Sequence, residues 1–269
     1  MTFISLIILL GFSASAWLIY KNIGQSHSSR LTQLTPALIA VLMETYLLKQ
    51  LIYPIEGAMN LGFFIAFALI SWLVSIQIMV SSLYRPLQSL GIVMFPVAGI
   101  ASLIAVLTPA TNNMNIVGNP LIQGHIMISI IAYSLIMLSA LQALTLAYQE
   151  HSIRAHHPGG FIRFLPPLHD METLLFQMLG FGFIFLSTAL VSGFFFVEDL
   201  FAQHLVHKTV LSIIGWFILA VLLFGRYRFG WRGKVAIRWT LAAFVFIMLA
   251  YFGSKMVLEF FLHQTASSI

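Results

Sequence analysis

Three histidines stand at the ends of long apolar runs, and they are the side chains of this sequence best suited to chemistry. His125 and His207 each open such a run, and His263 closes the last one. A neutral imidazole can bind a metal ion through one ring nitrogen while its other nitrogen donates a hydrogen bond. Two such rings suffice for a haem iron, provided that apolar walls surround the macrocycle and cations neutralise its propionates. Anchoring of a helix end in the lipid headgroup region is the alternative interpretation of each histidine.

Other ionisable groups supply the remaining candidates. Lys208 and Lys255 are cations close in sequence to these helix ends. His204 and His207 are spaced to share a helical face and bind zinc, although two histidines alone are a weak signal and an acidic loop is the alternative. Glu44 lies midway along the second apolar run, where a carboxylate is costly unless it faces a partner or a cavity or is protonated. A transport role and a simple hydrogen bond to a neighbouring helix are both open for Glu44.

The composition excludes most other kinds of chemistry. The chain has no cysteine, which rules out disulfides, cysteine-based zinc or iron–sulfur sites and a thiol nucleophile. The sequence also contains no nucleophile elbow, phosphate-binding glycine loop or metalloprotease helix. The pI of 9.6 comes from thirteen Lys and Arg spread over short segments, which indicates membrane topology rather than nucleic-acid binding. We do not expect this chain to be an enzyme on its own.

The elements that must position these residues are transmembrane helices. Of the 269 residues, 60% are hydrophobic and 8% are charged, and the mean hydropathy is +0.97. Because about 20 apolar residues span a bilayer as a helix, we predict an all-α polytopic bundle of eight spans in a single membrane domain, residues 1–269. An irregular loop is expected over residues 149–170. The predicted spans are residues 2–20, 35–53, 60–81, 88–107, 121–148, 171–197, 206–225 and 235–262.

Basic residues predict the orientation of these spans, because cytoplasmic segments collect lysine and arginine. Three of the thirteen, Lys49, Lys208 and Lys255, fall on one side of the membrane. We therefore expect that side to be the periplasm, with both termini and the three terminal histidines near the outer boundary. The other ten fall on the opposite side: Lys21, Arg30, Arg85, Arg154, Arg163, Arg226, Arg228, Arg232, Lys234 and Arg238.

Four stretches of the second half carry a resemblance to a known family. They run from His125 to Gln149, from Leu165 to Gly193, from His207 to Gly233 and from Leu249 to Leu258. In order and spacing they are similar to the CcsA/HemX cytochrome c assembly family, and the whole chain resembles its short YpjD-type members. The resemblance implies a multi-pass protein of the bacterial inner membrane that handles haem together with other cytochrome c maturation proteins.

The resemblance also implies a haem b site at the outer face. His125 matches the outer-face histidine that opens this helix in haem-handling members, and His263 falls close to the second outer histidine. We hypothesise that these two residues ligate the haem iron and that His207 is the substitute ligand. Lys208 and Lys255 are then the cations that neutralise the propionates.

Two departures from the family pattern argue against a complete synthase. The tryptophan-rich WxWD haem loop is replaced by FFFVEDLFAQHLVHK, and Gly225 stands near the place of a histidine at the inner end of the seventh span. An accessory haem-binding factor for cytochrome c maturation is therefore the function we predict. The alternatives are a non-catalytic scaffold or regulator of tetrapyrrole metabolism and, third, a Glu44-dependent proton-coupled transporter.

Overall fold

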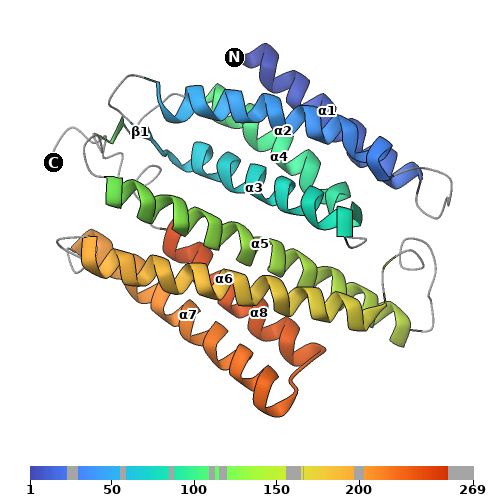
Figure 1. Cartoon of the computed structure of the whole chain (residues 1–269), viewed down its shortest axis with the longest axis vertical. Coiled ribbons are helices and arrows are strands. Elements are labelled where there is room, and N and C mark those ends of the chain that lie inside the picture. Colours follow the sequence, from blue (N-terminus) through green and yellow to red (C-terminus); the bar gives the residue numbers. More distant parts are fainter. Residues whose placement is uncertain are drawn as a thin grey trace. The chain divides into compact units, whose positions relative to one another are not determined.

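Long helices dominate the fold, and the described part of the chain contains eight of them; Figure 1 shows their arrangement within each unit. The computed structural model of the chain describes residues 1–22, 30–54, 59–84, 88–108, 113–114, 120–155, 165, 167–196 and 203–253. Within these residues all eight helices are long and apolar enough to cross a bilayer, which confirms the predicted all-α class and the number of spans. They are α1 (Thr2–Lys21), α2 (Arg30–Ile52), α3 (Phe63–Tyr84), α4 (Gly91–Leu107), α5 (Pro120–Arg154), α6 (Leu168–Phe196), α7 (Gln203–Phe229) and α8 (Lys234–Met248).

Several helices extend beyond the apolar runs that predicted them. α2 begins at Arg30 instead of residue 35, and α5 continues to Arg154 instead of residue 148. The predicted loop 149–170 is therefore wrong at both edges, since α6 begins at Leu168. An apolar run marks the part of a helix at hydrocarbon depth, whereas the backbone hydrogen bonds continue into the polar interface. In α5 the added turn is supported by Glu150, whose Oε1 accepts hydrogen bonds from Arg154 Nε at 3.1 Å and Nη2 at 2.7 Å.

The last span ends differently from its prediction. α8 ends at Met248 and is followed by a π-helical turn, Leu249–Gly253. The predicted end at residue 262 lies outside the described residues. The other short elements are a 3-10 turn before α4, Gln88–Leu90, and two paired antiparallel segments of two residues each, β1 (Met59–Asn60) and β2 (Asn113–Met114).

Helices α1 to α4 form one compact unit. Each helix packs against the next, and α1 closes the ring by packing against α4. A Cβ added to Gly99 of α4 would stand only 2.8 Å from the Leu9 Cα of α1, so glycine is what permits this close approach. The rings of Phe12 and Phe95 stack across the same pair of helices with their centroids 5.6 Å apart.

Helices α5 to α8 form a second compact unit with the same closed order, in which α5 packs against α6 and α8. A Cβ on Gly182 of α6 would lie 3.1 Å from Ile136 Cγ1 of α5, and the Trp216 indole of α7 donates a hydrogen bond of 2.8 Å to Ser187 Oγ of α6. Because consecutive helices run in opposite directions, the start of α5, the end of α6, the start of α7 and the end of α8 meet at one end of this unit. Most of the candidate residues lie there.

Candidate functional site

His125 is the central residue of the candidate site and lies in the second turn of α5. Its ring Nδ1 is 2.9 Å from Ser192 Oγ of α6, and this hydroxyl donates its proton to the Ala189 carbonyl at 3.0 Å. Because the single proton of this hydroxyl goes to the Ala189 carbonyl, Ser192 Oγ can accept a hydrogen bond from the ring Nδ1. A ring oriented in this way could bind a metal through Nε2.

Gly193 makes room for this ring. A Cβ at position 193 would lie 3.1 Å from His125 Cε1, which is closer than an ordinary van der Waals contact. It would lie 3.8 Å from Nε2, which is an ordinary contact distance. The imidazole therefore packs directly on the backbone of α6, and a side chain at position 193 would require the ring to shift by a few tenths of an ångström. Serine and glycine at positions 192 and 193 act together, one to orient the ring and the other to admit it.

Lys208 brings a positive charge to the same end of the second unit. It lies near the start of α7, close enough to His125 to act on it electrostatically. Its ammonium group stands 5.3 Å from the centroid of the Tyr251 ring, which is a cation–π distance, and Tyr251 packs at 5.2 Å on Tyr133 of α5. The two tyrosines are buried, so they hold the lysine against the bundle.

The structure thus brings His125 and Lys208, two of the residues that the sequence singled out, to one end of the unit. Helices α5, α6 and α7 and the π-helical turn that follows α8 contribute to this site. The side chain of His207 lies outside the described residues, although its backbone belongs to α7. His263 and Lys255 also lie outside the described part of the chain, so the proposed pairing of His125 with His263 stays a prediction. No cluster of three or more His, Cys, Asp or Glu occurs among the described residues.

Glu44 forms a separate polar contact inside the first unit. Its side chain is fully buried, and its Oε1 accepts a hydrogen bond from Ser102 Oγ of α4. Within the described residues Oε2 has no hydrogen-bond partner. The sequence predicted that this carboxyl group would face a partner or a cavity or be protonated, and in the structure Ser102 is a hydrogen-bond partner. The bond links α2 to α4, which are not consecutive in the ring.

No pattern along the chain pointed to Ser192, Gly193, Tyr133 or Tyr251. Hydrogen bonds and ring contacts between helices have no characteristic spacing in sequence, because the partners are separated by a whole span or more. The histidine and the lysine were visible because polar residues at the ends of apolar runs are conspicuous, while a serine and a glycine inside a transmembrane helix are common.

Fold and site together define a multi-pass membrane protein with eight helices and a histidine–lysine site at one end of its second four-helix unit. A model of the family described as cytochrome C assembly protein matches residues 31–262, and the chain belongs to that family. It is 30% identical over 256 residues to the inner membrane protein YpjD of Escherichia coli K12, covering 94% of this chain and 97% of the relative. An uncharacterized 28.8 kDa protein of Azospirillum brasilense is 32% identical over 137 residues, which cover 50% of this chain and 51% of that protein.

These comparisons confirm the family that the sequence resembled, including its YpjD type, and the protein is a multi-pass inner membrane protein. No solved structure matches the chain. The family is associated with haem and with cytochrome c assembly, whereas the particular role of this member has to be argued from its own residues.

Proposed function

We propose that this protein is an accessory haem-handling factor of cytochrome c assembly, with its haem site around His125. The observation that carries the proposal is the His125 ring, whose Nδ1 lies 2.9 Å from Ser192 Oγ, a contact that fixes the orientation of the ring. Metal-ligating histidines usually donate their second nitrogen to a fixed oxygen in this way. Membership of the cytochrome c assembly family supports haem as the ligand.

The residues around His125 fit a haem in charge and in polarity. When bound, a haem would supply an iron that takes imidazole ligands and two propionates that require cations. His125 would hold the iron, and Lys208, which lies on the Tyr251 ring, would neutralise a propionate. Phe194 and Phe195, exposed directly after Gly193 at the end of α6, offer an apolar surface beside the site.

A second axial ligand completes the proposed site. His263, or His207 in its place, has this role, and Lys255 is a second cation for the propionates. His207 directly precedes Lys208 at the start of α7, and His263 follows the last span in sequence. Haem b is the expected form, because a chain without cysteine cannot hold a haem through thioether bonds.

We infer that this end of the second unit faces the periplasm and that both termini lie on the same side. The opposite end of the unit contains Arg154, Arg226, Arg228, Lys234 and Arg238, whereas Lys208 is the basic residue described at the His125 end. Since cytoplasmic segments collect such residues, the basic end is the inner one. A haem at His125 would then be presented where apocytochromes c receive it.

Glu44 has a different role in this account. Its hydrogen bond to Ser102 supports the pairing of α2 with α4, as polar side chains inside bilayers commonly do. We therefore favour a structural role for Glu44 over proton-coupled transport.

The proposed function predicts that His125 is required for cytochrome c maturation. In cells lacking the gene, plasmid-borne wild type should restore haem-stained c-type cytochromes in the membrane fraction, and His125→Ala should lower the restored amount by about tenfold or more, as expected when a metal ligand is lost. His169→Ala is the matched control, because His169 is exposed in the first turn of α6 at the other end of the unit. Membrane levels of each variant are measured by immunoblot.

Normal c-type cytochromes in the deletion strain would contradict the assembly role. That result would favour the alternative of a non-catalytic scaffold or a regulator of tetrapyrrole metabolism. Equal activity of the His125→Ala and His169→Ala variants would show that His125 is not required for cytochrome c maturation.

A further inference from the structure

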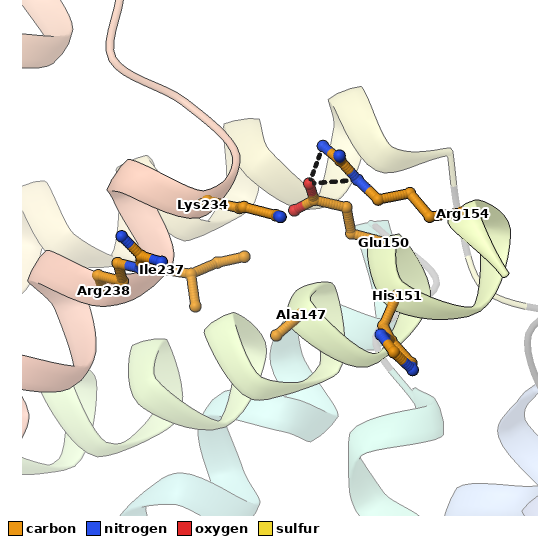
Figure 2. A pocket seen from close by; sticks show the side chains of 7 residues that line it. All are labelled: Ala147, Glu150, His151, Arg154, Lys234, Ile237 and Arg238. Carbon is orange, nitrogen blue, oxygen red and sulfur yellow. Dashed lines mark hydrogen bonds and ion pairs between the residues drawn. The ribbon is translucent and has the colours of Figure 1, made fainter.

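A second site lies at the basic end of the second unit, opposite the His125 end. A pocket of about 240 Å³ opens between the last turns of α5 and the first turns of α8 (Figure 2). Its lining combines three cations, one carboxylate and one histidine with two small or apolar side chains. The residues are Ala147, Glu150, His151 and Arg154 of α5 and Lys234, Ile237 and Arg238 of α8.

The charges in this pocket are unbalanced. Glu150 is engaged by Arg154, which forms a salt bridge of 2.7 Å with its Oε1. Lys234 and Arg238 remain as positive charges, and within the described residues neither side chain forms an ion pair or a hydrogen bond. Figure 2 shows Lys234 reaching from α8 toward Glu150 on α5. A second carboxylate, that of Glu172, lies beside the pocket and accepts a hydrogen bond of 2.7 Å from the Gly233 N–H. The three cations still outnumber the two carboxylates, so the pocket attracts an anion that Lys234 and Arg238 can hold from the α8 side.

Aromatic residues place this pocket at the depth of the lipid headgroups. The rings of Phe229, Trp231 and Trp239 form a row at the same end of the unit, in which the first two are stacked with centroids 6.3 Å apart and the last two are tilted with centroids 5.6 Å apart. Tryptophan and tyrosine gather where the hydrocarbon meets the headgroups. Large apolar side chains, Tyr148 of α5 and Val235 of α8, are exposed on the helices that flank the pocket. Headgroup and acyl chain of one lipid could thus contact the same pair of helices.

We propose that this pocket binds the phosphate group of an anionic phospholipid. Arginine presents a planar set of donors that matches phosphate oxygens, and lysine adds a point charge. Basic pockets between transmembrane helices on the inner side of a membrane are suited to such headgroups. Free phosphate has the same charge chemistry, but the aromatic row and the exposed apolar flanks favour a lipid. The proposal stands independently of haem binding.

Removing the charge of Glu150 should change the affinity for the headgroup in a definite direction. Its carboxylate repels a phosphate and engages Arg154, which would otherwise be available as a donor. The Glu150→Gln variant should therefore bind the headgroup more tightly than the wild type, by about fivefold, the change that one charge near a membrane surface makes. A pocket that only holds α5 and α8 together would lose stability on the same change and gain no affinity.

The test is native mass spectrometry of the full-length protein, purified in detergent and stripped of lipid. Phosphatidylglycerol and phosphatidylcholine with identical chains are titrated separately. The wild type should prefer phosphatidylglycerol by about fivefold or more, and the Lys234→Gln/Arg238→Gln variant should lose that preference. The Arg228→Gln/Arg232→Gln variant is the matched control, because it removes two exposed charges from the same end without touching the pocket. Retention of helix content by circular dichroism shows that each variant is folded.

Three results would overturn the proposal. Equal binding of the two lipids by the wild type would exclude a specific headgroup site. An equal loss of the preference for phosphatidylglycerol in the Arg228→Gln/Arg232→Gln control would show that the preference comes from diffuse attraction by a basic surface. Displacement of phosphatidylglycerol by inorganic phosphate at equal concentration would show that the pocket binds a free anion instead of a lipid.

Discussion

The Ser192 hydroxyl donates to the carbonyl of Ala189, and its Oγ lies 2.9 Å from the Nδ1 atom of His125. With its single proton used in this way, Ser192 Oγ can accept a hydrogen bond from Nδ1, and this arrangement favours metal binding through Nε2. Sequence reasoning found His125 and Lys208 because both interrupt apolar surroundings at a helix end. It missed Ser192 and Gly193, whose importance comes only from the way that α6 packs against the start of α5.

Ser192→Ala should therefore weaken haem binding without removing a ligand. The ring loses its acceptor and its fixed orientation, and we expect the affinity to fall by about tenfold to a hundredfold, as for other partners of metal-ligating histidines. The reduction potential should also rise, because an imidazole without this hydrogen bond is a weaker donor to iron. Titration with haemin, followed by absorbance, and a redox titration measure the two effects.

The control for Ser192→Ala is Thr188→Ala. The Thr188 hydroxyl is exposed on the same helix and donates to the Ile184 carbonyl of its own backbone. Its removal should leave both haem affinity and potential unchanged. Equal effects of the two variants would show that Ser192 has no special relation to His125.

At the scale of the helices, the composition predicts the type of element and the pattern of apolar runs predicts their number, whereas neither predicts where the helices end. The start of α2 at Arg30 and the end of α5 at Arg154 lie in polar sequence, where hydropathy no longer indicates whether the chain is helical. Side-chain contacts such as that of Arg154 with Glu150 decide how far the helix continues. The closed ring of each four-helix unit was also not predictable, because helix packing depends on small residues that have no period in this sequence.

Gly99 tests the packing of α1 against α4. The Cβ of an alanine at this position would lie 2.8 Å from the Leu9 backbone, which cannot yield as a flexible side chain would. We expect Gly99→Ala to lower the free energy of unfolding by about 1–3 kcal/mol, the usual cost of overpacking. A scanning-fluorimetry Tm or a denaturant titration in detergent measures the loss.

Gly180→Ala is the matched control for this packing test. A Cβ at Gly180 of α6 meets nothing within 4 Å, so alanine should be neutral there or stabilise the helix by about 0.5–1 kcal/mol. Equal destabilisation by both substitutions would mean that helix α1 does not approach Gly99 closely.

For the whole molecule, the distribution of basic residues predicts the orientation in the membrane. The absence of cysteine allows a direct measurement with single-cysteine variants. Leu121→Cys marks the His125 end of α5, and Tyr227→Cys marks the basic end of α7; both positions are exposed. A membrane-impermeant maleimide should label Leu121→Cys in intact spheroplasts and Tyr227→Cys only after lysis. The reverse pattern would place the histidine site in the cytoplasm and contradict presentation of haem at the outer face.

The central claim is that His125 holds a haem, and an absorption spectrum of the purified protein tests it most directly. Oxidised and dithionite-reduced spectra, with a pyridine haemochrome assay, are recorded for the wild type, His125→Ala and His263→Ala, before and after addition of haemin. We predict near-stoichiometric haem b in the wild type and its loss in His125→Ala, with a second loss in His263→Ala if that residue is the other ligand. A wild type that stays colourless after haemin addition, or a His125→Ala spectrum identical to that of the wild type, would contradict the account.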